Sequence, residues 1–466
     1  MYVTIEPPKP HSVEQNTLME FFIKGESQEL WMPCGTKFGK TLGASTALAT
    51  AGLLRPGSKW RWVGPIYEQA KLGFTEMQSV LPKKPYVDVN LAGPRITTAK
   101  GTVFEFWHGQ KPTSLEGAAI DGYVLDEFAK MKGEVYESAF TTTTRTLGGF
   151  VVISTPLGKG FFYKKCMEAK EEMEWALKRG KVPKKLFITA PTSANPYISK
   201  ERIKEAKERM PERLYRQFYL AEFLDDASVF VGVKNTVYGE LLEFTGHREF
   251  WFDENPEEKA VVIGVDWAKK RDYTVFVAID YTETPRKIVG FLRFHQQPYT
   301  TQVGELIRFC RKFKQVEVVY HDKTGVGEAL DDMLAETYLS FEGITFTNAT
   351  KAEMVNLLIM TYEQGNIRTP NWGTMLGELD AYEVKFSAIG NMSYGAPEGL
   401  HDDCVSSLML ANAAAEEYSS SSLSVKVIEE KENTSKKESD IVDFSSYFNK
   451  LIEDDDDDFD NEIKLF

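Results

Sequence analysis

The first half of the chain alternates short apolar runs with longer stretches of helical character. Helices are expected over Leu42–Leu54 and, with more charge, over 164–180 and 198–223. Strands that alternate with helices are typical of a parallel sheet covered by helices. The pattern therefore predicts an α/β domain. Its buried strands are expected at Glu29–Pro33, Trp60–Val63, Val103–Trp107, Tyr123–Leu125 and Phe150–Ile153.

A second pattern begins after a weakly patterned connector at residues 226–256. Val261–Val265 and Tyr273–Asp280 are two predicted strands separated by a short polar loop, which favours a hairpin. Consecutive strands followed by alternating helices predict a mixed sheet in a second α/β domain. The remaining elements are expected as strands at Lys287–His295 and Val316–His321, and as helices at Gln302–Phe313, Glu328–Glu336 and about Asp402–Tyr418.

The composition changes after Tyr418. A serine run leads into sequence rich in Lys, Glu and Ser and then into Asp454–Asp458, so we expect an acidic, disordered tail. The whole chain has 466 residues and a formal charge of −14, which argues against a protein that simply coats nucleic acid. Any contact with DNA needs a local basic surface. The triplet Lys269, Lys270 and Arg271 is a candidate for that surface.

Composition also limits the class of protein. The four cysteines are scattered and have no CxxC or zinc-ligand spacing, so neither a disulfide scaffold nor a structural zinc site is expected. A reducing cytosol is the default compartment for such a chain. No apolar run approaches the roughly 18 residues of a membrane helix, and we expect no membrane partner.

Residues Pro33–Thr41 read PCGTKFGKT between a predicted strand and a predicted helix. Such a loop can surround phosphates with backbone N–H groups, while a lysine supplies a cation and a hydroxyl binds magnesium. Lys40 would reach the β- and γ-phosphates, and Thr41 would bind Mg²⁺. The usual pattern has glycine six positions before the lysine, where this chain has Cys34 and then Gly35. An ordinary strand–turn–helix is the alternative.

Two acids end a later apolar strand in the sequence YVLDE. Asp126 would support the magnesium ion, and Glu127 would orient and deprotonate an attacking water. A third strand ends in Ser154–Pro156, a position that can sense loss of a γ-phosphate. Alone, the acids could be solvated and the third strand end could be a turn. Following the loop in one alternating pattern, they predict nucleotide hydrolysis.

Aspartates also gather at element ends in the second half. Asp266 and Asp322 end two predicted strands, and Asp272 starts the strand after the first of them. Asp402 and Asp403 open the last helix. Carboxylates at one sheet edge repel each other unless cations lie between them, and oxygen ligands suit Mg²⁺ or Mn²⁺. Two such ions would activate water and stabilise the leaving 3′ oxygen in phosphodiester cleavage. Helix caps and turns are the alternative roles.

The order and spacing of these motifs resemble the large terminase subunit of tailed bacteriophages, over about residues 10–418. The resemblance is carried by GTKFGKT, VLDEF, ISTP, GVDWAKKRDYTVFVAID, HDKTGVG and HDD. It implies a P-loop ATPase domain of the ASCE type with a parallel sheet at 1–225 and a linker at 226–256. An RNase H-like mixed α/β nuclease domain follows at 257–418, and an acidic, disordered tail at 419–466.

The resemblance also assigns roles to single residues. Glu127 is implied as the catalytic base of the ATPase, and Gln15 as the residue that reads adenine. The family often has an arginine where this loop has Lys37, so the arginine finger is left to Arg145 as a candidate. ATP and Mg²⁺ are implied at Gly35, Thr36, Lys37, Gly39, Lys40, Thr41, Asp126 and Thr155. The nuclease metals (Mg²⁺, with Mn²⁺ possible) are implied at Asp266, Asp322 and one or both of Asp402 and Asp403, supported by Asp272. The implied catalytic acids are Asp266, Asp322 and Asp403.

The implied function is an ATP-driven motor that packages viral double-stranded DNA and also cuts concatemeric DNA. Implied partners are a portal protein, a small terminase subunit and further copies of the chain in a ring, on a procapsid in the host cytoplasm. The residues alone leave two alternatives. One is a helicase or DNA-remodelling ATPase whose RNase H-like domain is not catalytic. The other is a binding module with degenerate motifs, against which the intact Lys40, Asp126 and Glu127 argue.

Overall fold

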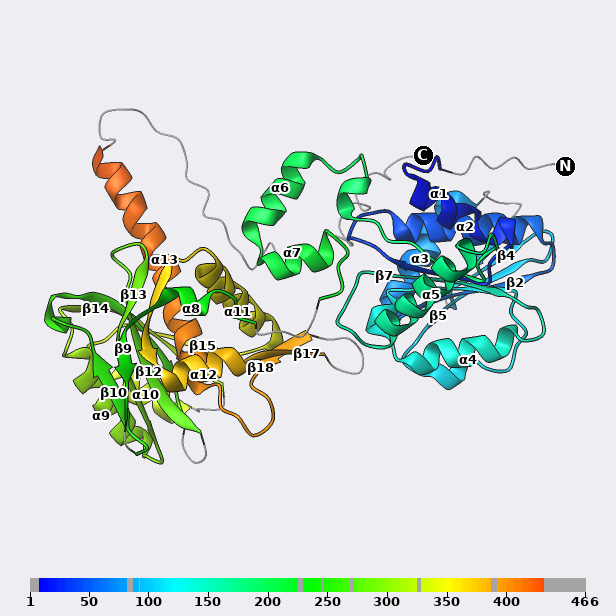
Figure 1. Ribbon diagram of the computed structural model, residues 1–466. Helices are drawn as coiled ribbons and strands as arrows, with labels where there is room; N and C mark the ends of the chain where they lie inside the picture. Colours follow the sequence, from blue (N-terminus) through cyan, green and yellow to red (C-terminus); the bar gives the residue numbers. More distant parts are fainter. Residues whose placement is uncertain are drawn as a thin grey trace, which may run out of the picture. The chain divides into compact units, whose positions relative to one another are not determined.

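The computed structural model (Figure 1) describes residues 8–81, 87–91, 93–224, 229–244, 246–268, 272–324, 328–386 and 392–430. Residues 1–416 form one compact unit and residues 417–466 a second. Two large sheets lie in the first unit, one in each half of its sequence. Among the described residues we find no helix with the length and hydropathy needed to cross a bilayer.

The first sheet has eight strands in the order β3-β4-β5-β2-β6-β7-β1-β8. From β5 to β8 all neighbours are parallel, and β4 and β3 add an antiparallel edge. All five predicted strands are confirmed. The strand bounds are β1 Glu29–Pro33, β2 Lys59–Gly64, β3 Val87–Asn90, β4 Arg95–Thr98, β5 Val103–His108, β6 Gly122–Asp126, β7 Gly149–Ser154 and β8 Lys185–Phe187.

Helices cover both faces of this sheet, which is why every residue of β1 and of β6 is buried. Alternate residues of β1 point to opposite faces. Met32 belongs to the core that includes α1, α2 and α3, whereas Trp31 belongs to the core that includes α4 and α5. The helix bounds are α1 Val13–Lys24, α2 Lys40–Leu54, α3 Tyr67–Val80, α4 Gly133–Thr143 and α5 Phe161–Leu177, with short 3-10 helices η1 Pro112–Leu115, η2 Phe128–Lys130 and η3 Thr192–Ala194.

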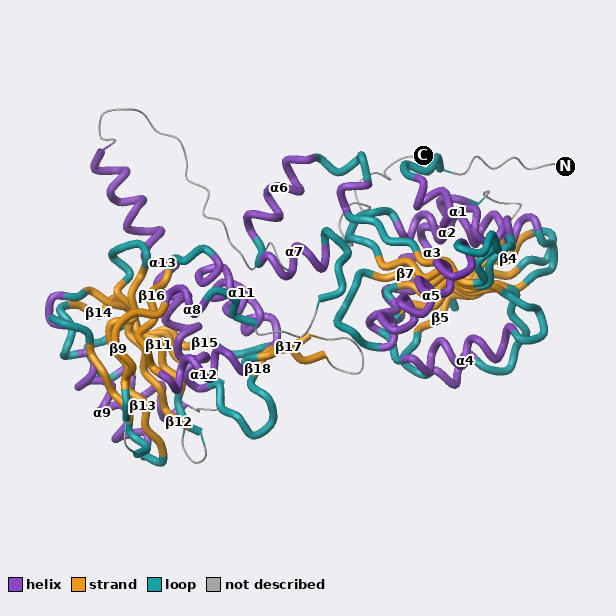
Figure 2. Tube along the Cα trace, in the orientation of Figure 1, coloured by secondary structure: helices purple, strands orange, loops and turns teal. Residues whose placement is uncertain are grey.

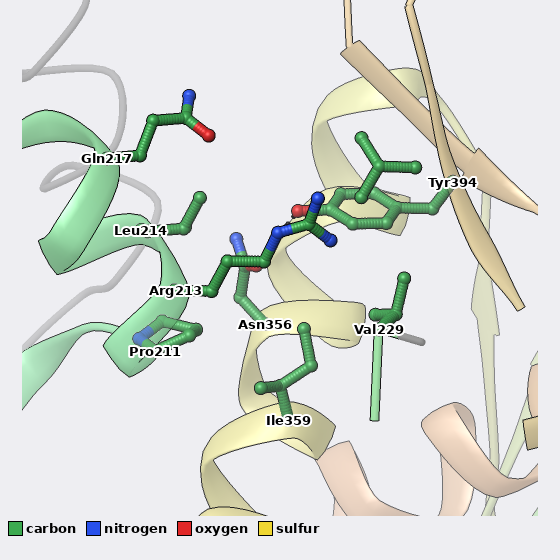
Figure 3. Close-up of a pocket in the computed structure, with 9 residues that line it drawn as sticks. Pro211, Arg213, Leu214, Gln217, Val229, Asn356, Ile359 and Tyr394 are labelled. Atoms are coloured by element: carbon green, nitrogen blue, oxygen red, sulfur yellow. Dashed lines mark hydrogen bonds between the residues drawn. The ribbon is translucent and has the colours of Figure 1, made fainter. Parts of the chain in front are cut away.

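The helix expected over 198–223 is two shorter helices, α6 (Lys200–Arg209) and α7 (Glu212–Phe218). Pro211 causes the break, because proline has no backbone N–H and forces the preceding residue out of helical geometry. Met210 is accordingly extended, with φ −130° and ψ 153°. Residues of α7 line a pocket together with α11 (Asn348–Glu363) and β18 (Met392–Gly395), shown in Figure 3. Its free volume of about 10 Å³ is too small for a ligand.

The second sheet has the order β15-β14-β11-β12-β13-β16-β9, and β10 pairs with β13. Strands β11, β12 and β13 form the expected antiparallel run, while β14 and β15 continue parallel to β11. Two of its strands, β9 and β10, come from the segment 226–256, which the weak sequence pattern presented as a connector. The bounds are β9 Val237–Leu242, β10 Glu249–Phe252, β11 Ala260–Asp266, β12 Tyr273–Asp280, β13 Arg286–His295, β14 Gln315–Asp322, β15 Phe341–Ile344 and β16 Ile367–Trp372.

Helices flank the second sheet as well (Figure 2). The core with α9 and α10 includes Ile263, Phe276 and Leu306. Helix α13 crosses β11 so closely that a Cβ atom at Gly264 would lie 2.0 Å from the carbonyl oxygen of Ser407. The bounds are α8 Val233–Thr236, α9 Tyr299–Cys310, α10 Glu328–Ala335, α12 Gly373–Ala381 and α13 Asp403–Glu430, with η4 Pro256–Glu258 and a small hairpin of β17 (Glu383–Phe386) and β18.

Candidate active sites

Distant segments hold the loop between β1 and α2 in place. The Gly35 N–H donates to Ala190 O at 2.9 Å, and the Thr36 N–H donates to Phe218 O at 2.7 Å. The Thr192 hydroxyl donates back to Thr36 O at 2.7 Å. A Cβ atom at Gly35 would lie 2.6 Å from the Thr192 backbone nitrogen, so only glycine fits without a shift. The loop is therefore fixed by packing before any nucleotide binds.

The unusual Cys34 has a structural explanation. Its side chain is fully buried in the core below α2, and its N–H donates to Ser154 O at 2.9 Å. Burial raises the pKa of its thiol to about 12, so the side chain is a neutral core group at physiological pH. The glycine that the loop needs is displaced by one position, to Gly35.

Lys37 and Gly39 give the loop its sharp turn. Both have left-handed backbone geometry, with φ 54° at Lys37 and φ 94° at Gly39. The strain at Lys37 is offset by Asn195, whose side-chain amide donates to Lys37 O at 2.8 Å. Helix α2 begins directly after Gly39, so the positive end of its dipole lies at the loop, where an anion would be stabilised. Thr41, the expected magnesium ligand, lies in its first turn.

Lys40 brings three of the predicted motifs together. Its buried ammonium lies 2.9 Å from Oε1 of Glu127 and donates to Oγ1 of Thr155 at 3.3 Å. Burial alone would raise the pKa of Glu127, but the positive charges of Lys40 and Lys130 outweigh it and hold that pKa below its usual value. Burial and the charge of Glu127 instead raise the pKa of Asp126. The charge of the Lys40 ammonium thus favours the ionised form of Glu127, the residue expected as the base.

Glu127 also has an uncommon backbone conformation. Its φ of 49° is left-handed, which for a residue with a side chain costs on the order of 1 kcal/mol. Its N–H donates to Oδ1 of Asp126 at 3.0 Å. Nearby, Oγ of Ser154 accepts the Ala129 N–H at 3.1 Å, which ties the end of β7 to the turn after Glu127. These bonds position the carboxylate toward Lys40.

Gln15 lies against the phosphate loop and is buried. Its amide donates to Gly39 O at 3.2 Å, and its Oε1 accepts the His11 N–H at 3.0 Å. Contact with adenine stays a prediction. The loop and Glu127 are also supported from outside the recognised motifs, by His11, Thr192, Asn195 and Lys130.

The predicted aspartates of the second half do gather at one sheet edge. Asp266 ends β11 and Asp322 ends β14, and these two strands are parallel neighbours. Asp403 is the first residue of α13, which packs on β11. Burial raises the pKa of Asp266 well above its usual value, and the charges of Asp403, Asp322 and Asp402 add to the shift. Carboxylates that repel one another in this way are stabilised by a divalent cation between them, and their oxygens are the ligands that such ions prefer.

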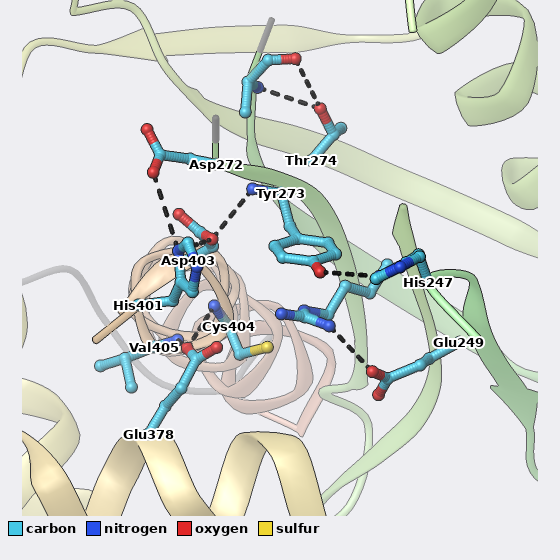
Figure 4. A network of polar contacts seen from close by, with 12 residues as sticks. His247, Glu249, Asp272, Tyr273, Thr274, Glu378, His401, Asp403, Cys404 and Val405 are labelled. Carbon is cyan, nitrogen blue, oxygen red and sulfur yellow. Dashed lines mark hydrogen bonds and ion pairs between the residues drawn. The ribbon is translucent and has the colours of Figure 1, made fainter. Parts of the chain in front are cut away.

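Asp272 and His401 extend this cluster toward the surface (Figure 4). His401 Nδ1 lies 3.7 Å from Oδ1 of Asp272 and 3.4 Å from Oδ2 of Asp403, a grouping that could hold a metal ion. The Tyr273 N–H donates to the same Asp403 oxygen at 3.0 Å. His401 was missed as a candidate, although it stands directly before the two aspartates in the HDD motif.

Two further residues reach the cluster from other helices. Oε2 of Glu378, on α12, accepts the Cys404 N–H at 2.8 Å and the Val405 N–H at 3.4 Å, so it fixes the start of α13. Burial raises the pKa of Glu378 to about 7. Lys351, on α11, places its Nζ 3.2 Å from Oδ2 of Asp402. Neither residue belongs to a recognisable motif.

A buried ion pair lies beside Tyr273, the first residue of β12. The Arg293 guanidinium lies 3.4 Å from the ring centroid of Tyr273 and donates to Oε1 of Glu249 at 2.8 Å. The other Glu249 oxygen accepts bonds from the Trp372 indole and, at 2.8 Å, from the Thr374 hydroxyl. A continuous set of contacts therefore joins Glu249 to the acid cluster through Tyr273.

We expect Glu249→Ala to lower the free energy of unfolding by about 3–5 kcal/mol, because it leaves a buried guanidinium without its partner. Both side chains of the pair are only 9% exposed. Urea unfolding would measure the change. Glu305→Ala, which removes the pairs that Glu305 on α9 makes with the exposed Arg248 and Arg308, should cost about 1 kcal/mol or less. Equal losses in the two variants would contradict this assignment.

The known proteins to which this chain is similar include phage terminases. A family model described as the terminase RNaseH-like domain matches residues 263–414. The large terminase subunits of Thermus virus P23-45 and of Thermus phage G20c are each 28% identical over 449 residues, with 88% of each chain covered. A solved large terminase of a thermophilic bacteriophage has the same fold, with a TM-score of 0.51 at 14% identity, over 87% of this chain and 99% of that one.

These findings confirm the two-part fold expected from the motifs, an ATPase-type parallel sheet followed by an RNase H-like mixed sheet. In the first sheet one strand, β7, separates the loop-bearing β1 from the acid-bearing β6, as an ASCE-type ATPase requires. In sequence over most of its length, and in fold, the chain is similar to phage large terminase subunits.

Proposed function

We propose that this chain is an ATP-driven motor subunit that packages viral double-stranded DNA and cuts concatemeric DNA by a two-metal mechanism. The observation that carries the proposal is the presence of two separate constellations in one chain. One joins Lys40, Glu127 and Thr155 at the phosphate loop. The other joins Asp266, Asp322 and the start of α13 at an edge of the second sheet.

In the ATPase site, the Lys40–Glu127 ion pair must open for catalysis. The triphosphate would attract the Lys40 ammonium, which frees the Glu127 carboxylate to accept a proton from the attacking water. Asp126 and Thr41 would hold Mg²⁺, which shields the phosphate charges. Because Thr155 also contacts Lys40, movement of that lysine would reach the end of β7. This gives the chain a physical route from nucleotide state to motion.

In the nuclease site, Asp266, Asp322, Asp402 and Asp403 would hold two Mg²⁺ or Mn²⁺ ions, with Asp272 in support. When bound, the ions would lower the pKa of water and stabilise the leaving oxygen. The chain itself orients this set: Glu378 fixes the first turn of α13, and the Tyr273 N–H fixes Asp403. His401 would help to orient Asp272 and Asp403.

The remaining parts of the proposal concern organisation. We assign the ATPase to residues 1–225 and the nuclease to 257–418. Strands β9 and β10 of the segment 226–256 join the nuclease sheet, and α13 runs on to Glu430, so the helix extends past residue 419, where the tail was expected to begin. The motor would work as a ring of copies on a procapsid in the host cytoplasm, with a portal protein and a small terminase subunit. Arg145, which is exposed after α4, would serve a neighbouring copy as arginine finger. The basic triplet 269–271, a proposed DNA contact, lies outside the described residues.

Three assays on the purified full chain test the proposal: ATP turnover, plasmid cleavage with Mn²⁺ or Mg²⁺, and strand separation of a forked duplex. The wild type should hydrolyse ATP and cut DNA without separating strands. Lys40→Ala should lose ATP turnover and still cut the plasmid, because the two sites use different residues. Strand separation without cleavage would favour the helicase alternative instead, and absence of turnover and cleavage would refute the proposal.

A further inference from the structure

Lys351 places an ammonium group inside the acid cluster of the nuclease domain. Its Nζ lies 3.2 Å from Oδ2 of Asp402, and its side chain is 24% exposed. Its charge also acts on Asp266, whose pKa it lowers against the effect of burial and of the surrounding acids. A cation therefore already lies beside the carboxylates that are expected to bind metal.

The backbone that carries Lys351 is well fixed. Lys351 is in the first turn of α11, where Thr347 and Thr350 form a capping box. Two rings flank the ammonium, with their centroids 5.8 Å away for Tyr382 and 6.0 Å away for Phe346. The anchored helix start fixes the base of the side chain, while its four-carbon stem leaves the ammonium free to change partner.

The polar groups around the ion pair are not all satisfied. Tyr382 is fully buried, and its hydroxyl has no hydrogen-bond partner among the described residues. The Lys351–Asp402 pair itself is only half-buried, with side chains 24% and 30% exposed, so water can replace either partner at modest cost.

The ammonium and a metal ion cannot both use Asp402 at low cost. A divalent ion on a carboxylate oxygen lies about 2.1 Å from it. Lys351 holds the same carboxylate through a contact of 3.2 Å. Two cations only a few ångströms apart in a partly buried site repel strongly. Release of Lys351 from Asp402 would therefore favour metal binding at this carboxylate.

We propose that Lys351 is the exchangeable counter-ion of the nuclease site, which pairs with Asp402 in the DNA-free protein and moves to a backbone phosphate when DNA enters. The inference rests on the proposed nuclease function. A phosphate supplies the anion that the ammonium needs after leaving Asp402, and a lysine can contact it as a point charge. DNA and metal then bind cooperatively, and the coupling is reciprocal by linkage.

Calorimetric titration of the DNA-free full chain with Mn²⁺ tests the exchange. Lys351→Met should bind Mn²⁺ on the order of tenfold more tightly than the wild type, because a competing cation is gone. Lys287→Met is the matched control, since Lys287 pairs with Asp253 at 2.6 Å and also lies over a tyrosine ring, that of Tyr238. The control should bind Mn²⁺ with the affinity of the wild type. Lys351→Arg keeps the positive charge, so its Mn²⁺ affinity should also be close to that of the wild type.

A second readout separates exchange from a merely structural role. Duplex affinity is measured by fluorescence anisotropy with and without Ca²⁺, on DNA shown to remain intact. Ca²⁺ should increase the affinity for duplex DNA less in Lys351→Met than in the wild type, because the variant has no ammonium group to move from Asp402 to a phosphate. If Lys351 only orders Asp402, its loss would instead weaken Mn²⁺ binding.

The possible failures are distinguishable. Unchanged or weaker Mn²⁺ binding by Lys351→Met, in protein that melts cooperatively, overturns the exchange and leaves the nuclease proposal intact. Asp266→Asn must abolish the Mn²⁺ signal of the wild type. If it does not, the acid cluster is not the metal site, and the nuclease proposal falls together with this inference.

Discussion

Glu127→Gln is expected to abolish ATP hydrolysis while leaving nucleotide binding intact. The glutamine keeps the shape of the side chain but cannot take a proton from water, so turnover should fall by about 10²–10⁴-fold. Binding should be retained or tightened, because Lys40 loses the carboxylate that lies 2.9 Å from it and that competes with phosphate. Phosphate release measures turnover, and a fluorescent ATP analogue measures affinity.

The same sheet offers a matched control for this variant. Glu105 on β5 is 15% exposed, against 18% for Glu127, and it also pairs with basic side chains, Arg61 and Lys59. Glu105→Gln should therefore hydrolyse ATP at nearly the wild-type rate. Hydrolysis by Glu127→Gln at the rate of this control would remove Glu127 from the role of base.

Asp266→Asn should abolish DNA cleavage and spare ATP hydrolysis. The substitution removes a central carboxylate from the proposed metal set, and we expect a loss of at least about a hundredfold in plasmid cleavage with Mg²⁺. It also removes a buried charge that three other aspartates oppose. The unfolding temperature of Asp266→Asn in EDTA should therefore be higher than that of the wild type. A lower unfolding temperature would instead indicate damage to the fold.

Asp280 provides the comparison for Asp266. It is the last residue of β12, which runs antiparallel to β11, is buried, and pairs with Lys259 at 3.3 Å. Asp280→Asn should cleave DNA normally and lose some stability, since it weakens an ion pair instead of relieving repulsion. Normal cleavage by Asp266→Asn would show that the acid cluster has another role.

The strands that carry chemistry could be predicted from sequence because each is a short apolar run that ends in polar residues. β1, β6, β7, β11, β12 and β14 were all expected close to their observed bounds. Motif residues follow these strand ends, so a correct strand also places the site. The break at Pro211 was missed because helical composition continues on both sides of it.

Elements with weak internal patterns were not predictable in the same way. β9 and β10 lie in the segment 226–256, where alternating and exposed positions give no clear period, and pairing with β16 and β13 decides their structure. Glu378 and Lys351 act from α12 and α11 on residues 26 or more positions away. Only tertiary packing brings such side chains to a site, and a linear pattern contains no trace of it.

The hydrogen bonds that hold the phosphate loop decide where the chain can be shortened to give a folded ATPase fragment. Thr192 and Phe218 bond directly to Thr36, although both lie beyond the last strand of the first sheet. A shortened chain that ends after β8 would contain the whole sheet and every nucleotide-binding motif, yet it would lack these bonds. The smallest autonomous ATPase fragment must therefore extend through Tyr219, whose carbonyl oxygen also accepts the Thr192 N–H at 2.8 Å.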